Sequence, residues 1–194
     1  MDPSSFATAY GLSTSIGIRP FLTLALASIA MHLGYLHVSH AFAFLDTTGA
    51  TWLLAGLAVL EFVAEKIPVV DHVLHVVHFA TKPVAAAVLV GSAASSGASP
   101  DASAGVMMGL AALNAIGVHT GVAAVRGASS AMTLGVANPF VSLAEDVLTV
   151  VAAVLSILVP LAGAALAVIV TVLLAVIARH LYLEVRRRRA TVAA

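Results

Sequence analysis

Long runs with almost no charge dominate the chain. They cover residues 20–36, 51–61, 84–91, 105–118 and 147–178. A membrane-spanning helix needs about 20 apolar residues, and several of these runs reach that length when their flanking small residues are included. Only 9% of the residues are charged, whereas a soluble domain carries about 25%. Lipid must therefore cover much of the surface of this protein.

The composition of the runs selects helices over strands. Only helices and closed barrels satisfy all their backbone polar groups inside a bilayer. Barrel strands would alternate apolar and polar residues, but these runs are continuous and rich in Ala, Leu and Val. We therefore expect an all-α fold, a polytopic transmembrane helical bundle of about six hydrophobic segments, some of them broken or re-entrant.

Turn residues and small polar stretches delimit the segments. The six expected segments are residues 6–36, 51–67, 83–94, 104–125, 139–158 and 161–183. The first is interrupted at residues 19–20, and a short amphipathic stretch at 71–81 precedes the third. A Gly/Ser-rich connector at 127–137 is expected between the fourth and fifth.

The segments are expected to form one transmembrane domain, residues 1–194. A polar loop at 95–103 divides it into halves 1–97 and 104–194, and the chain ends in a basic tail, 184–194. Residues 20–25 and 139–144 share four identical positions, which suggests an inverted repeat of two three-helix halves, as in many transporters. A competing register aligns residues 63–66 with 143–146, so the repeat stays an open alternative.

Charge placement predicts the orientation. Arg179 and the cluster at 186–189 place the C-terminus in the cytoplasm by the positive-inside rule, and an even number of spans would place the N-terminus there too. The chain start lacks the positive region of a cleavable signal peptide, so the first segment is expected to be retained. Cysteine is absent, which excludes disulfides, iron–sulfur clusters and thiolate zinc sites.

A few ionisable residues lie inside or beside the apolar runs. An ionised side chain at that depth costs several kcal/mol unless it is paired, protonated or hydrated. The acids fall in pairs, four residues apart or adjacent, and two arginines are their natural counter-charges. These groups form either structural pairs that lock the bundle or a path for an ion or proton. The expected substrate- or ion-binding residues are Arg19, Glu61, Glu65, Lys66, Arg126, Asn138, Glu145 and Asp146.

Two Pro-Phe sites are candidate helix starts within the membrane. Pro20 follows Arg19 directly, and Asn138 suits an N-cap before Pro139 at the first helical position. Half-helix N-termini carry unpaired N–H groups and bind anions. The alternative is that Pro20 only kinks a helix while Arg19 extends to the membrane interface.

The histidines form a third candidate cluster. Asp71, His75 and His78 share one helix face and are plausible ligands for zinc or another transition metal. The favoured alternative is that they form the polar side of an interfacial helix, with Asp71 as its N-cap. His119 lies inside the fourth segment, where it pairs with a carboxylate, lines a pore or ligates haem.

Gly-xxx-Gly spacing recurs in the fourth segment, at Gly105 and Gly109 and at Gly117 and Gly121. This spacing favours close helix contact, either inside one bundle or between copies. We expect a homo-oligomer.

The motifs at residues 11–12, 19–21, 60–72 and 138–146 resemble a family of bacterial integral-membrane proteins known as domain of unknown function 4126. The similarity extends from about residue 11 to the basic tail. It implies a small multi-span protein of the bacterial inner membrane whose shared core holds these polar motifs, and it implies no reaction, substrate or cofactor. Lys82 stands where an Arg is expected and His75 where an acidic residue is common, which weakens His75 as a family-wide metal ligand.

These features predict a small membrane transporter or channel for an ion or a small polar or anionic solute. The alternatives are an accessory or scaffold subunit of a larger membrane complex and a metal- or haem-binding protein that uses its histidines. No P-loop, dinucleotide motif or nucleophile–base arrangement is present, so we expect no enzymatic activity and no required cofactor. The expected partners are the lipid bilayer, a second copy and an ion or small solute, and no nucleic acid.

Overall fold

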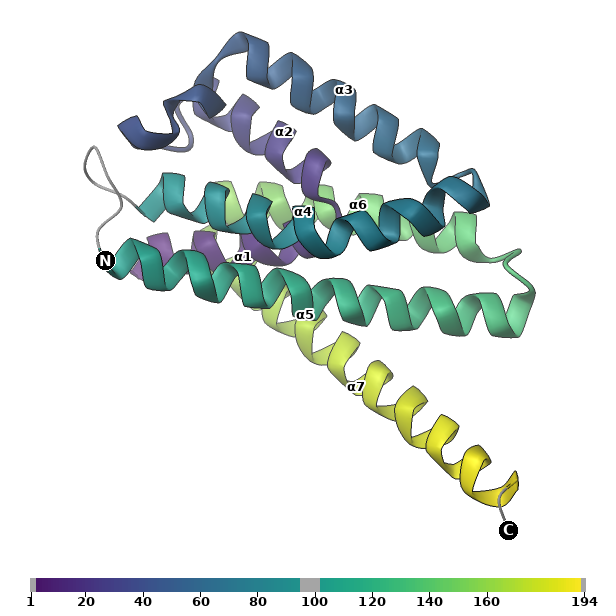
Figure 1. The fold of residues 1–194 in the computed structure, drawn as a ribbon. Helices are drawn as coiled ribbons and strands as arrows, with labels where there is room; N and C mark the ends of the chain where they lie inside the picture. The colour runs from purple at the N-terminus through teal and green to yellow at the C-terminus, as the bar shows by residue number, and fades with distance from the viewer. Residues whose placement is uncertain (1–2, 95–101, 193–194) are drawn as a thin grey trace.

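The computed structural model describes residues 3–94 and 102–192, and all the regular structure in them is helical (Figure 1). The expected all-α bundle is confirmed. In chain order the elements are α1 (Pro3–Ile18), α2 (Pro20–His32), the 3₁₀ helix η1 (His40–Asp46), α3 (Thr48–Ala64), α4 (Pro68–Ala94), α5 (Ala102–Thr133), α6 (Asn138–Leu158) and α7 (Pro160–Val192).

In the part of the chain that the structure describes, four helices are long and apolar enough to cross a membrane. These spans are Val73–Ser92 in α4, Ala102–Thr133 in α5, Asn138–Leu158 in α6 and Pro160–Glu184 in α7. A fifth is formed if η1 and α3, which meet at a bend of 63°, cross together. The expected six hydrophobic segments thus correspond to four or five candidate spans among the described residues. The first expected segment, residues 6–36, is not a single span.

The first hydrophobic segment folds back on itself as a hairpin of α1 and α2. Arg19 joins the two helices in extended conformation, with φ −133° and ψ 99°. Figure 1 shows the chain start and the end of α2 on the same side of the molecule. Beyond α2, the backbone N–H of Ser39 donates to the carbonyl of Ser92 near the end of α4. At about 24 and 20 Å in length, the two helices are each too short for a hydrocarbon layer of about 30 Å.

The tip of this hairpin lies halfway along its neighbours. A Cβ added to Gly17 would lie 2.6 Å from Cβ of Val118, near the middle of α5. The Nζ of Lys82, near the middle of α4, donates to the carbonyl of Ile18. Since α4 is about 40 Å long, the turn at Arg19 is about 20 Å from either of its ends.

α1 is the central helix of the bundle and packs against α4, α5, α6 and α7. Its hydroxyl side chains are satisfied locally, because Thr14 donates to the carbonyl of Tyr10 and accepts from the amide of Asn114. Apolar side chains around it form one core in the half of the molecule that holds the chain start; its buried members include Leu12, Ile16, Leu24, Leu89, Ala115 and Ala153.

Two predicted boundaries need correction. α4 is continuous through Pro83, so residues 71–81 are part of a long helix and not a separate amphipathic stretch. α5 likewise continues through the expected connector to Thr133. The reversal into α6 is made only by the turn that follows, where Leu134 and Gly135 have positive φ values of 52° and 86°. The expected loop at 95–103 lies mostly outside the described residues.

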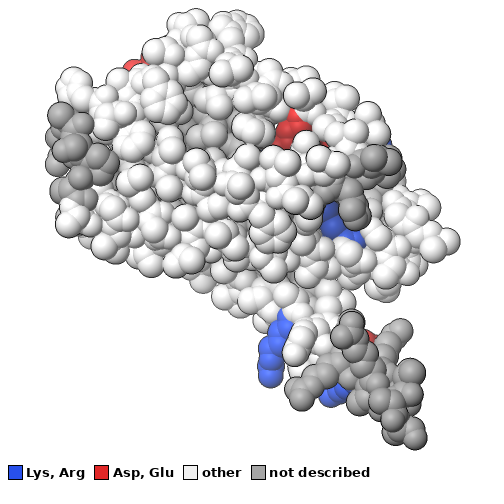
Figure 2. Space-filling view, viewed as in Figure 1, with Lys and Arg blue, Asp and Glu red and all other residues white. Residues whose placement is uncertain are grey.

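The outer surface is largely apolar, as lipid contact requires. α3 shows this most clearly, because it packs mainly on α2 and leaves Trp52 75% exposed. Figure 2 shows a nearly uncharged face on which acidic and basic groups come close together in one half of the body, with further basic groups on the projecting end of α7. Charge is therefore concentrated toward one end of the bundle.

Candidate functional site

Arg19, at the hairpin tip, is the centre of a buried ion network. Its side chain is 2% exposed and faces acids from two other parts of the chain. Nη1 pairs with Glu65, which directly follows α3. Nε lies 2.9 Å from Oδ1 of Asp146, and Nη2 lies 3.4 Å from Oε2 of Glu145, both on α6. One arginine thus joins the hairpin to α3 and α6.

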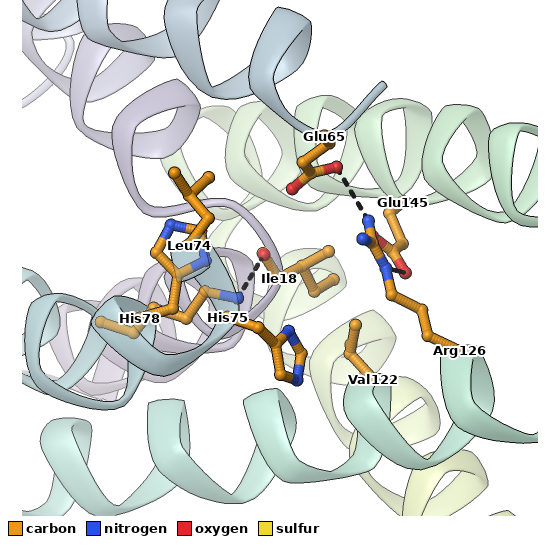
Figure 3. Close-up of a pocket in the computed structure, with 9 residues that line it drawn as sticks. Ile18, Glu65, Leu74, His75, His78, Val122, Arg126 and Glu145 are labelled. Carbon is orange, nitrogen blue, oxygen red and sulfur yellow. Dashed lines mark hydrogen bonds and ion pairs between the residues drawn. The ribbon is translucent and has the colours of Figure 1, made fainter. Parts of the chain in front are cut away.

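Arg126 extends the network from α5. Its Nε and Nη2 donate to the two carboxylate oxygens of Glu145 at 3.0 and 2.5 Å. Nη2 also donates to Oε2 of Glu65 at 2.8 Å. Figure 3 shows these three side chains converging from the end of α3, from α5 and from α6. A bidentate arginine–carboxylate pair is among the strongest polar contacts in proteins, so Arg126 fixes α5 to α6 and to the end of α3.

Ser142 adds a neutral junction. Its Oγ accepts from Nη2 of Arg19 at 2.9 Å and from Nζ of Lys66 at 3.1 Å. It donates to Oε2 of Glu65 at 3.2 Å. We call the charged groups joined here the ion network; its three cations and three carboxylates balance, and its members are Arg19, Glu65, Lys66, Arg126, Glu145 and Asp146.

The two helix ends at the hairpin tip are stabilised by residues outside the ion network. Nζ of Lys82 donates to the carbonyls of Gly17 and Ile18 at 3.0 and 2.8 Å and lies 3.0 Å from Nδ1 of His119. It therefore places a positive charge at the C-terminus of α1, whose last carbonyls have no partner within the helix. The Glu61 carboxylate interacts with the backbone amide of Phe21 at the N-terminus of α2, where negative charge is favourable.

A cavity of about 820 Å³ leads to the ion network from the end of the molecule that holds the α3–α4 and α5–α6 connections. We call it the vestibule. Its walls include Glu65, Lys66, His75, Arg126, Ser130, Asn138 and Ser142. On the other side of the network, a crevice of about 280 Å³ opens between α2, α3 and α6. Its walls are mostly apolar, and Arg19, Glu61 and Asp146 lie among them.

The structure brings most of the predicted site residues together. Six of them form the ion network. Glu61 is buried apart from it, with its Oε1 3.3 Å from Nε2 of His78. Asn138 lines the vestibule, but it is the first residue of α6 and not its N-cap, and its amide donates to Oγ of Ser130 at 2.8 Å. Pro139 stands near the helix start as expected.

Two contributors were not recognised in the sequence. Ser142 precedes Glu145 by three residues, so the two share a helix face; that spacing could have identified it. Lys82 stood out only as a departure from the family pattern. Its partners are backbone carbonyls, which leave no trace in a sequence.

The histidines do not assemble a metal centre with the other described residues, among which no group of three His, Asp or Glu side chains is placed to hold an ion. The Asp71 side chain lies outside what the structure describes. His78 is only 4% exposed, so the prediction that it lies on the polar side of a helix at the membrane interface is wrong. The ring of His119 packs against His75 at 4.5 Å between centroids, and its nitrogen meets Lys82 in place of a carboxylate.

Comparison with known proteins identifies a family for this chain. No curated protein and no solved structure matches the chain. The family model described as Domain of unknown function (DUF4126) matches residues 6–180, which include the hairpin, the ion network and the vestibule. The chain therefore belongs to the DUF4126 family of membrane proteins.

Proposed function

We propose that the protein is a transporter of a small anionic or polar solute. The observation that carries this proposal is the vestibule, a cavity of about 820 Å³ whose walls are partly apolar but carry charged and polar side chains where it reaches the ion network at the tip of a helical hairpin. Discontinuous helices that meet near the bilayer midplane form the substrate sites of many secondary transporters. The hairpin of α1 and α2 supplies such a pair of helix ends here.

The vestibule walls favour an anionic group. Nζ of Lys66 contacts Ser142 and lies 4.5 Å from the centroid of the Phe62 ring, and no carboxylate among the described residues is within ion-pair distance of it. Arg126 and the amide of Asn138 lie on the same cavity. Ammonium, guanidinium and amide groups can together replace the hydration shell of a carboxylate or an inorganic anion.

Alternating access explains the arrangement better than an open channel does. Beyond the hairpin tip the described part of the bundle is closed by tightly packed apolar side chains, with Leu12, Ile16 and Leu89 fully buried. A cavity that ends on such a core opens toward one end of the bundle only. Transporters pass through states of this kind, whereas a conducting channel needs a continuous path.

The orientation that fits the proposal places the vestibule toward the cytoplasm of a bacterium, in the inner membrane. α7 runs from the end of α6 toward the vestibule end of the molecule (Figure 1). Its last turns carry Arg179 and the arginines at 186–189, which the positive-inside rule places in the cytoplasm.

Flux measurements with purified protein in liposomes test the proposal, with chloride, inorganic phosphate and succinate as probes. We expect protein-dependent uptake of at least one probe. Uptake should be lost in Glu65→Gln/Glu145→Gln, which removes two carboxylates of the ion network, and kept in Glu184→Gln, whose side chain is half exposed near the end of α7. Equal uptake by empty liposomes, or full uptake by the double variant, would overturn the proposal.

An accessory subunit is the second candidate, because the ion network also holds the bundle together. Arg19 meets three carboxylates and Ser142. A Cβ on Gly105 or Gly109 would meet no atom of the described residues within 4 Å, so that helix face can receive another protein or another copy. A stoichiometric partner that co-purifies from native membranes, together with absent flux, would favour this candidate. A homo-oligomer by mass measurement would favour the first.

A further inference from the structure

We propose that Glu61 and His78 form a proton-binding site that couples proton uptake to the movement of the solute, which rests on the transport function proposed above. Glu61 lies in the last turn of α3 and His78 in α4, and their side chains are 2% and 4% exposed. Nε2 of His78 and Oε1 of Glu61 are 3.3 Å apart.

The pair lacks the hydrogen bonds that buried polar groups normally have. Within the described residues, no aligned hydrogen bond is made by either carboxylate oxygen of Glu61 or by Nε2 of His78. The backbone amide of Phe21 lies near the Glu61 carboxylate without forming such a bond. An ionised carboxylate in this position is expensive to bury. A proton held on the Glu61 carboxyl would turn the 3.3 Å contact into an O–H···N hydrogen bond to Nε2 of His78, and a short approach of the two side chains is enough to form it.

The surroundings favour a proton over a metal ion. The groups that face the pair come from every neighbouring element: Arg19 at the hairpin tip, His75 and Lys82 on α4, His119 on α5 and Asp146 on α6. Two of these groups, the Arg19 guanidinium and the Lys82 ammonium, are cations close to the pair, and they repel a divalent metal ion. Two ligands are also too few for a closed metal site.

Charge balance links the pair to the vestibule. The ion network is neutral, and Lys82 with ionised Glu61 adds one charge of each sign. One proton on the Glu61–His78 pair therefore leaves a single positive charge in the buried site. Binding of one monovalent anion in the vestibule removes that excess, and charge excess is costly at this depth. The expected cycle is electroneutral symport of one proton with one monovalent anion.

A route for the proton is present between the pair and the vestibule. A small cavity is lined by His75, His78 and Lys82 together with Glu65 and Arg126, and His75, Glu65 and Arg126 also line the vestibule. Figure 3 shows His75 and His78 on the same stretch of α4, beside this cavity. A proton from vestibule water can thus reach His78 without crossing the apolar core.

Infrared difference spectroscopy of the purified protein during a pH titration tests proton binding without any transport. We expect a carboxylic-acid C=O band that is lost in Glu61→Gln, is kept in Glu184→Gln and titrates at a different pH in His78→Gln. Monodisperse elution and thermal stability close to wild type identify variants that fold. If Glu61→Gln does not fold, Glu61→Asp takes its place, and the band should then shift in frequency or in the pH at which it titrates. Absence of the band in the wild-type protein, or its persistence in Glu61→Gln, would overturn the proposal.

Flux driven by a pH gradient separates this proposal from the transport function. Wild-type uptake of the transported probe should rise with an imposed proton gradient, and folded Glu61→Gln should lose that response. If uptake does not change with the proton gradient and the wild-type protein shows no carboxylic-acid band, the transport function stands and the proton-binding site is refuted. A band that depends on Glu61 in a protein that moves none of the probes refutes transport and the coupling role while the proton-binding site stands.

Discussion

Replacement of Arg126 by Gln is the sharpest test of the ion network as a structural and functional unit. The arginine makes contacts of 2.5 and 3.0 Å with Glu145 and of 2.8 Å with Glu65. Its loss leaves two buried carboxylates with only Arg19 to neutralise them. Loss of one partner of a buried pair costs about 3–5 kcal/mol. Because Arg126 borders the vestibule and water can enter there, we expect about 3 kcal/mol, the lower end of that range.

A double-mutant cycle isolates the pair from its surroundings. Glu145→Gln alone removes a carboxylate from both arginines, whereas Arg126→Gln/Glu145→Gln removes one charge of each sign and restores the balance of the network. The double variant should therefore lose less stability than the sum of the two single losses. We expect a coupling free energy of about 2 kcal/mol, within the range measured for close charge pairs.

Equilibrium unfolding in mixed detergent micelles measures these differences. Trp52 is the only tryptophan of the chain and lies on α3, so its fluorescence reports the release of that helix. Arg179→Gln is the matched control, because Arg179 is exposed on α7 and lies outside the ion network, and about 0.5 kcal/mol or less is expected for such a change. Additive losses in the cycle, or a loss in Arg179→Gln as large as in Arg126→Gln, would refute the reasoning.

Two further results are expected. The chain has no cysteine, so single-cysteine variants can be labelled with a membrane-impermeant maleimide. Ser4→Cys and Thr48→Cys should be labelled from one side of the membrane and Leu134→Cys from the other. Labelling of Ser4→Cys and Thr48→Cys from opposite sides would mean that residues 6–36 form a single span. Gly17→Ala should lower the free energy of unfolding by about 1–3 kcal/mol, and with it the melting temperature, since the new methyl group would overlap α5. In the control Gly117→Ala the methyl group meets open space among the described residues, so the melting temperature should stay unchanged or rise.

The fold class followed from the sequence because lipid leaves few choices, but the reversal at Arg19 did not. α1 and α2 together have about the length of one span, and Pro at the first position of α2 fits a kinked helix as well as a hairpin. The direction is decided by contacts that are distant in sequence, such as the hydrogen bonds from Lys82 to the end of α1 and from Ser39 to Ser92. Backbone acceptors of this kind are invisible in a sequence.

The site residues could be selected from the sequence because charged residues are so rare in the apolar runs, but their pairing could not. Glu61 and Glu65 are four residues apart, which predicts one helix face. Glu65 follows the end of α3 in helical backbone conformation and pairs with Arg19 and Arg126, while Glu61, one turn earlier, meets His78. Which partner each acid meets depends on how α1, α4 and α5 pack around the end of α3, and the spacing of the two acids does not encode this.

The charges at the hairpin tip also indicate which contacts in the bundle would weaken when Glu61 takes up a proton. Lys82 holds the end of α1 with hydrogen bonds to two carbonyls, so α1 is fixed to α4 irrespective of Glu61. The start of α2 lies instead beside the Glu61 carboxylate. α3 packs mainly on α2 and has little contact with α4, whereas α2 also packs on α1, α4 and α6. Neutralising Glu61 weakens an electrostatic contact inside the α2–α3 pair and beside the crevice, while the body of α1 and α4–α7 keeps its contacts. A transport cycle driven by this proton would therefore begin at the contact between Glu61 and the start of α2, while Arg126 still ties the end of α3 to α5 and α6.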